Sequence, residues 1–150
     1  MENKIRVLPP DVLMEPLLGL VQEGNEVPLV ISGNSMSPFL VHGRDTVYLS
    51  KLTDKPKKGD IILYRRDSGD YILHRVCKVK GESYSFVGDA QSYIETGIRP
   101  DQLLAVVKTV KRKGKIITSG NFWWEFFEKV WINMIPLRRF TVGAYTRLKH

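Results

Sequence analysis

The segment ISGNSMSP, at residues 31–38, directly follows an apolar run that begins at Val27 and is typical of a strand. A Gly-Asn pair precedes Ser35 and a Met-Ser-Pro corner follows it, so the chain is expected to turn sharply there. A serine on such a turn can present its hydroxyl and its own backbone N–H to the same point. A serine nucleophile needs both groups, because it attacks a carbonyl and must then stabilise an oxyanion. The same residue types are also common in ordinary turns.

On either side of this segment, the sequence predicts a mainly β fold with an N-terminal helix. The expected strands cover residues 27–32, 46–49, 61–64, 71–80, 84–87, 103–110 and 115–118, with a loop over 88–100. An apolar series after Asp11 predicts a helix that ends at Gly24, with Pro16 either at its start or at a kink. The sequence is therefore expected to divide into three regions: a helical segment at 1–25, an antiparallel β domain at 26–118 and a helical tail at 119–150.

The tail is rich in aromatic residues and contains all three tryptophans of the chain. At helical spacing, one side is apolar: Phe122, Trp123, Phe126, Phe127, Val130, Trp131 and Met134. The other side is mainly polar: Glu125, Glu128, Lys129, Ile132 and Asn133. Three interpretations fit this pattern. The helix packs back on the domain, lies in a membrane interface, or binds a partner protein. We favour the first interpretation.

Bulk properties restrict the class of protein. The 150 residues suffice for one domain with a hydrophobic core, and the single cysteine, Cys77, excludes an internal disulfide framework. No signal peptide or membrane-spanning segment is recognisable, so we expect a cytoplasmic protein that can still bind a membrane face peripherally. The net charge of +7 reflects 23 basic against 16 acidic residues, many of the basic ones late in the chain. Nucleic acid is not the expected partner, because this excess alone would give weak, salt-sensitive binding.

His74, in the expected strand 71–80, is the candidate general base for Ser35. A histidine has a pKa near neutrality and can take a proton from a hydroxyl and return it to a leaving amine. Taken alone, His74 fits a core histidine that a backbone group satisfies better than it fits a catalytic base. His42 lies closer to Ser35 in the sequence, but it precedes Gly43 and fits a turn better.

Four short motifs occur in the order found in the superfamily of signal peptidases and LexA-like repressors. The string Gly-Asn-Ser-Met-Ser-Pro resembles its Ser-Met-x-Pro box, in which the serine before the methionine, here Ser35, is the nucleophile. Gly59-Asp60-Ile61 resembles its Gly-Asp-Ile/Val strand, and His74-Arg75-Val76 resembles the His-Arg-Val box of archaeal and endoplasmic reticulum signal peptidases. Gly88-Asp89 resembles the Gly-Asp that follows. The resemblance covers roughly residues 26–112 and implies a LexA or signal-peptidase-like β fold.

The resemblance also implies roles for further residues. Asp89 would support the site by orienting His74 or stabilising its charged form, and Gly33, Asn34, Met36 and Glu95 would form the oxyanion and substrate-binding region. Two positions depart from the family. Gly33 occupies a position where a serine often binds the oxyanion, and Glu95 stands where a second aspartate is usual. The oxyanion hole would then depend on backbone donors, chiefly the N–H of Ser35. Neither a metal nor a cofactor is expected.

Together, the residues and the resemblance predict a serine endopeptidase that cleaves a leader or signal-like peptide after small residues, with a peptide or protein as its substrate. The alternative is a non-catalytic peptide-binding or regulatory domain of the same fold. A self-cleaving repressor fits least, because the roughly 25 residues before the β domain are too few for a DNA-reading helix-turn-helix with a cleavable linker.

Overall fold

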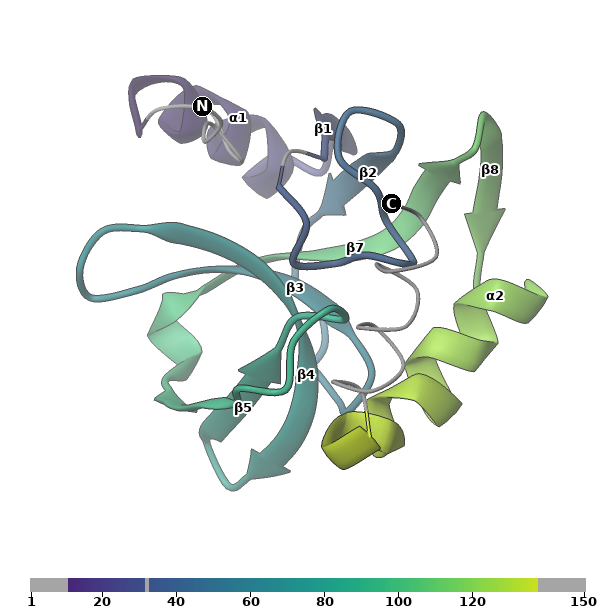
Figure 1. Cartoon of the computed structure of the whole chain (residues 1–150). Coiled ribbons are helices and arrows are strands. Elements are labelled where there is room, and N and C mark those ends of the chain that lie inside the picture. Colours follow the sequence, from purple (N-terminus) through teal and green to yellow (C-terminus); the bar gives the residue numbers. More distant parts are fainter. Residues whose placement is uncertain (1–10, 32, 138–150) are drawn as a thin grey trace.

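The computed structural model of the protein describes residues 11–31 and 33–137. The expectations for residues 1–10, for Ser32 and for the basic residues after position 137 therefore lie outside the described residues. The described residues form one N-terminal helix, eight strands and a helical C-terminal segment (Figure 1). The elements are α1 (Asp11–Gln22), β1 (Val27–Val30), β2 (Thr46–Ser50), β3 (Ile61–Arg65), β4 (Tyr71–Lys80), β5 (Ser83–Val87), β6 (Glu95–Ile98), η1 (Pro100–Gln102), β7 (Leu103–Arg112), β8 (Lys115–Thr118), α2 (Phe122–Glu125), η2 (Phe126–Val130) and η3 (Trp131–Leu137).

The strands form one antiparallel sheet in the order β1-β2-β7-β3-β4-β5-β6, with β8 paired to β7. The long strands β4 and β7 flank β3 at its centre. This arrangement confirms the prediction of a mainly antiparallel β protein with a helix at each end. It places β1, which leads into the segment at 31–38, at an edge of the described sheet, whereas β4, which carries His74, lies near its centre.

Alternating side chains of β3 divide the apolar interior into two clusters, because successive residues of a strand point to opposite faces. Ile61 and Leu63 belong to the larger cluster, which also contains residues of α1, β1, β2 and the tail. Ile62 and Tyr64 belong to the smaller cluster with residues of β4, β5 and β7. Both faces of the sheet centre are therefore covered by apolar side chains.

The tail packs back on the domain, which confirms the favoured interpretation for residues 122–137. Asn121 caps α2 by accepting hydrogen bonds from the N–H groups of Trp123 and Trp124. Trp124, Phe127 and Trp131 are buried in the larger cluster. Figure 1 shows the tail beside β8, with its last turns close to β4.

The predicted polar and apolar sides of the tail are wrong in part. Ile132, assigned to the polar stripe, is buried, and Phe122 and Trp123, assigned to the packed side, are exposed. The reason is that the segment is not one regular α-helix. It changes to a π-helix in η2 and to a 3₁₀ helix in η3, and each change alters the angle between successive side chains.

Candidate active site

The loop from residue 31 to residue 45 is closed at its base by backbone hydrogen bonds and by the buried carboxylate of Asp45. The N–H of Ile31 donates to the Asp45 carbonyl at 2.8 Å. The Asp45 carboxylate accepts from the N–H groups of Val41 and Lys113 at 2.8 and 3.0 Å. Burial alone would raise the pKa of Asp45, but the hydrogen bond from Arg44 and those two N–H groups lower it overall. An ionised Asp45 thus fixes where this loop leaves the sheet.

Ser35 lies within this loop, between residues that hold it in place. Met36 is buried in the larger cluster, and so is Phe39. The Ser35 carbonyl accepts a 2.9 Å hydrogen bond from the N–H of Ala90. Gly88 approaches the same carbonyl so closely that a Cβ atom there would lie 2.5 Å from the oxygen. The position of the serine is therefore set by the segment at residues 88–90 as well as by its own loop.

His74 lies opposite Ile62 in the β3–β4 ladder and is buried on the face of the smaller cluster. Its ring meets the edge of the Tyr64 ring at a centroid distance of 6.4 Å. Burial, and after it the positive charge of Arg66, lower the pKa of His74 to about 4, whereas the negative charge of Glu95 opposes this shift. The imidazole is therefore neutral at physiological pH, which is the form that accepts a proton.

Ser35 and His74 line one cavity of about 270 Å³ between the start of the loop and β4. The described residues that line it are Leu29, Val30, Ile31, Gly33, Ser35, Met36, Arg66, Tyr71, Ile72, Leu73, His74 and Gln91. Most of these side chains are apolar. Among the hydrogen bonds of the described residues, none joins the Ser35 hydroxyl to His74, and none uses the Ser35 N–H. Catalytic hydrogen bonds often tighten only when substrate binds.

The expected role of Asp89 in holding His74 is not what the structure shows. Both carboxylate oxygens of Asp89 accept hydrogen bonds from Arg75, each at 2.9 Å, and both side chains are buried. Arg75 also donates to the Gly59 carbonyl. Arg75 follows His74 directly along β4, so the two side chains point to opposite faces of the sheet. Asp89 therefore compensates a buried arginine on the far face and does not orient the imidazole.

Of the residues expected around the oxyanion, some line the cavity and others do not. The N–H of Gly33 donates to Nδ1 of His42 at 2.7 Å, so this N–H is not free to bind an oxyanion. Gly33 has a φ of 91°, a conformation that suits glycine. Asn34 is exposed and is not part of the cavity lining, whereas Met36 is both buried and part of it. His42 thus holds the loop and does not compete with His74 as a base.

Glu95 does not line the cavity, but it contacts Arg66, and Arg66 is one of the lining residues. The carboxylate of Glu95 binds Arg66 Nε at 3.0 Å and accepts a 2.6 Å hydrogen bond from the Tyr64 hydroxyl. Burial would raise the pKa of Glu95, but these hydrogen bonds lower it overall. Burial and Glu95 together raise the pKa of Tyr64. The three side chains form a fixed polar cluster next to His74.

Sequence reasoning missed three residues at this site. Arg66 lies in a charged segment that the sequence predicts only as a hairpin loop, and nothing in the sequence distinguishes it from Arg65. Gln91 was given no role from the sequence, yet it lines the cavity and accepts a hydrogen bond from the Gly88 N–H at 3.1 Å. Trp131 was assigned to packing, but its indole N–H also donates to the Asp89 carbonyl at 2.7 Å.

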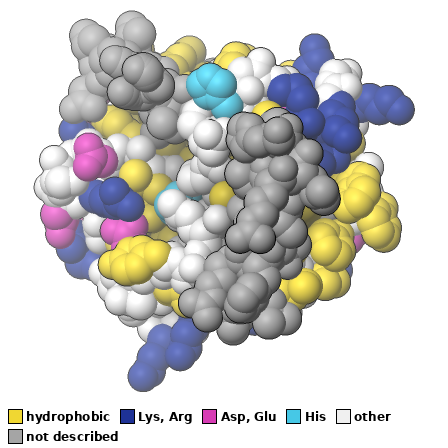
Figure 2. All heavy atoms as spheres, viewed as in Figure 1, with side chains coloured by type: hydrophobic (Ala, Val, Ile, Leu, Met, Phe, Trp, Pro, Cys, Tyr) yellow, Lys and Arg dark blue, Asp and Glu magenta, His cyan; other side chains and the backbone are white. Residues whose placement is uncertain are grey.

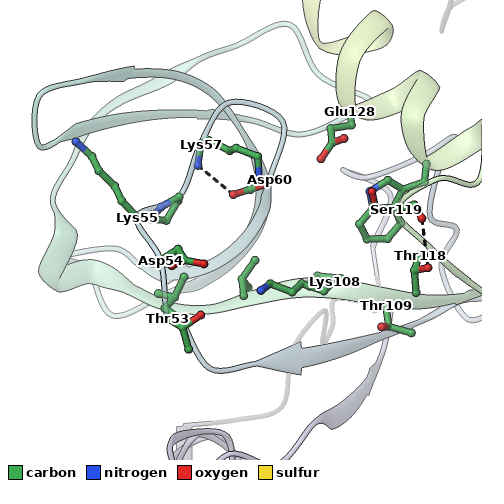
Figure 3. A pocket seen from close by; sticks show the side chains of 15 residues that line it. Thr53, Asp54, Lys55, Lys57, Asp60, Lys108, Thr109, Thr118, Ser119 and Glu128 are labelled. Carbon is green, nitrogen blue, oxygen red and sulfur yellow. Dashed lines mark hydrogen bonds and ion pairs between the residues drawn. The ribbon is translucent and has the colours of Figure 1, made fainter.

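A second cavity, of about 460 Å³, lies between the loop at residues 52–60, β7 and the tail (Figure 3). Figure 3 shows Lys57 and Asp60 pointing toward each other, with Glu128 reaching toward them from the helical tail. Burial and the charges of Glu125 and Asp60 raise the pKa of Glu128. Although this cavity is the larger, its lining contains no histidine or cysteine, so it holds no serine–histidine pair.

Within residues 11–31 and 33–137, no group of three or more His, Cys, Asp or Glu side chains is arranged to hold a metal ion. Over the same residues, no helix combines the length and hydrophobicity needed to cross a bilayer. Comparisons with protein-family models, with curated proteins and with solved structures find no match to this chain.

Proposed function

We propose that the protein is a serine endopeptidase with a signal-peptidase-like catalytic fold, in which Ser35 is the nucleophile and His74 the general base. The observation that carries this proposal is the single cavity that contains both side chains, with His74 held neutral by burial. The four ordered sequence motifs point independently to the same two residues. The proposed setting is the cytoplasm or the cytoplasmic face of a membrane.

The proposed reaction needs only groups at this site. The Ser35 hydroxyl oxygen attacks the scissile carbonyl while His74 accepts its proton. The N–H of Ser35, which is bonded to none of the described residues, stabilises the oxyanion of the tetrahedral intermediate. His74 then gives the proton to the leaving amine as the carbon–nitrogen bond breaks, which leaves an acyl ester on Ser35. Water, activated by His74, hydrolyses that ester and regenerates the serine.

The substrate is proposed to be an extended leader or signal-like peptide. β1 is an edge strand, and it contributes Leu29 and Val30 to one side of the cavity, while residues 71–74 of β4 form the other. An extended chain could pair with the outer edge of β1 through its backbone. The mostly apolar lining suits apolar side chains near the scissile bond. A proline beside the scissile bond, on the non-leaving side, should then abolish cleavage, and unimpaired cleavage would contradict this binding mode.

A diverse peptide library, read by mass spectrometry, tests the proposed activity. The wild-type protein should cleave a subset of peptides, and Ser35→Ala and His74→Ala should abolish that cleavage. Ser37→Ala is the matched control, because it removes a hydroxyl two residues away in the same loop. The second candidate is a peptide-binding domain without hydrolysis, favoured by the lack of a hydrogen bond between Ser35 and His74. Peptide affinity that Ser35→Ala leaves unchanged, without cleavage by any form, would support it.

A further inference from the structure

The beginning of the helical tail presents apolar side chains both to the core and to the surface. Trp124 and Phe127 point inward, whereas Phe122, Trp123 and Val130 have exposed fractions of 68%, 46% and 48%. The outward rings touch: the centroids of Phe122 and Trp123 lie 4.9 Å apart, and Phe122 stacks on Phe126 at 6.4 Å. We call the surface made by Phe122, Trp123, Phe126 and Val130 the apolar face. An exposed contiguous face of this kind indicates a binding surface.

Basic side chains border the apolar face. The guanidinium of Arg112 lies 5.6 Å from the centre of the Trp123 ring. Arg112 pairs with Lys115 across the β7–β8 hairpin, and this hairpin also carries Lys111 and Lys113; all three lysines are exposed. Figure 2 shows a group of hydrophobic side chains at the right edge of the molecule, where Figure 1 places α2, and Lys and Arg side chains directly above them.

The acidic residue nearest this face in the sequence is already compensated. Glu125 forms an ion pair with Lys129 and accepts hydrogen bonds from Ser119 Oγ and from the N–H of Gly120. These interactions, the one with Lys129 foremost, lower the pKa of Glu125. The basic hairpin therefore sets the sign of the local field, and the complementary partner is anionic.

We propose that the apolar face and the basic hairpin dock the protein on an anionic lipid membrane. Tryptophan and phenylalanine insert at the boundary between headgroups and acyl chains, and adjacent lysines attract anionic headgroups. A nucleic acid fits less well, because the Phe122 and Trp123 rings meet at 80° and cannot present a common stacking platform. Val130, an aliphatic side chain, likewise suits lipid rather than bases.

This surface is connected to the loop that carries Ser35. Arg112 donates from Nε to the Phe39 carbonyl at 2.7 Å, and the Phe39 ring packs against Trp124 and Phe127 on the inner side of the same helical segment. Docking would thus hold the molecule by an element directly beside the candidate active site. The membrane proposal stands on its own, because it requires no catalytic activity.

Vesicle flotation with the full chain tests the proposal. We expect binding to phosphatidylcholine vesicles that contain phosphatidylserine, little binding to phosphatidylcholine alone, and a blue shift of tryptophan fluorescence on binding. Phe122→Ser/Trp123→Ser should weaken binding by roughly tenfold or more, because it removes the inserted area. Lys113→Gln/Lys115→Gln should weaken it by about fivefold per lysine. Circular dichroism checks folding, and Phe122→Ser alone, at the most exposed position of the face, provides a milder variant.

Matched controls separate this surface from general stickiness. Tyr93→Ser removes a ring that is 78% exposed elsewhere, and Lys78→Gln/Lys80→Gln removes two exposed lysines of β4. Both controls should bind like the wild type. Three results would overturn the proposal: no binding to anionic vesicles, equal loss in the control variants, or a wild-type dimer in lipid-free solution that Phe122→Ser/Trp123→Ser converts to monomer. The last would mean that a second copy covers the face.

Discussion

The indole N–H of Trp131 donates a 2.7 Å hydrogen bond to the carbonyl of Asp89. The next residue, Ala90, donates its N–H to the carbonyl of Ser35. Two hydrogen bonds and one peptide unit thus connect the helical tail to the candidate nucleophile. The tail is therefore part of the structure that positions the site, in addition to covering the core.

Trp131→Phe tests this connection. The substitution keeps an aromatic ring but leaves a buried carbonyl without its donor, so we expect a loss of about 1–3 kcal/mol in the free energy of unfolding. Urea denaturation measures it. Trp123→Phe is the matched control, because Trp123 is 46% exposed and its indole N–H donates to none of the described residues. Equal effects of the two substitutions would contradict a specific role for Trp131.

Gly88→Ala should displace the nucleophile. The new methyl group would lie 2.5 Å from the Ser35 carbonyl oxygen. Neither the Cβ atom nor the backbone oxygen can rotate away, so the segment at residue 88 and the loop at Ser35 must move apart. We expect kcat/KM for peptide cleavage to fall by roughly tenfold or more, from an ångström-scale misplacement of Ser35.

Gly19→Ala is the control for this change, because a Cβ there meets nothing within 4 Å. Within α1 it should stabilise the protein by up to about 1 kcal/mol and leave activity unchanged. Full activity in Gly88→Ala would mean that the segment at residues 88–90 does not set the position of Ser35.

Asp89→Asn distinguishes a structural role from a catalytic one. Removing one charge of the buried pair leaves Arg75 uncompensated, so we expect a loss of about 3–5 kcal/mol in stability, measured by urea denaturation. The pH midpoint of kcat/KM should stay unchanged, because Asp89 does not contact His74. Asp67→Asn is the control: its pair with Arg99 is also made by two hydrogen bonds, but it is exposed to solvent and should contribute little to stability. A shifted pH midpoint in Asp89→Asn would instead support the expectation that Asp89 orients His74.

The pH dependence of cleavage follows from the burial of His74. The base form is the neutral imidazole, so activity should be lost only as pH falls through about 4, and it should be flat between pH 5 and 7. Arg66→Gln removes a positive charge that lowers the His74 pKa, so the midpoint should move upward toward neutrality. The kcat/KM profile measures both effects. A wild-type midpoint near 6.5, the value for an exposed histidine, would contradict the proposal that burial holds His74 neutral at low pH.

Three strands could be predicted from local patterns: β3 and β4 at the sheet centre from their apolar residues, and β8 from the Lys113-Gly114 turn before it. The expected ranges 61–64, 71–80 and 115–118 match β3, β4 and β8 to within one residue. β6 was missed within the expected loop at 88–100. Its residues Glu95–Ile98 include a glycine and only one buried side chain, and two residue pairs join it to β5. Such a short edge strand leaves no periodic signal in the sequence.

The candidate pair Ser35 and His74 could be predicted because motif order identifies residue types, and the structure brings both to one cavity. The interactions of the residues around this pair could not be predicted from the sequence. Whether Asp89 meets His74 or Arg75 depends on which face of β4 approaches the segment after β5, and that is a long-range property. Glu95 likewise meets Arg66 and Tyr64 only through sheet pairing. The irregular helical turns of the tail misled the periodicity argument for the same reason: tertiary packing, rather than local preference, determines them.

The most direct test of the account is kcat/KM for a peptide that the wild-type protein cleaves, compared among the wild type, Ser35→Ala, His74→Ala and Ser37→Ala. The account predicts that the first two substitutions each reduce cleavage by roughly a thousandfold or more, while Ser37→Ala stays within about threefold of the wild type. All variants should retain wild-type circular dichroism. Cleavage that survives Ser35→Ala or His74→Ala at the wild-type rate would contradict the assignment of nucleophile and base.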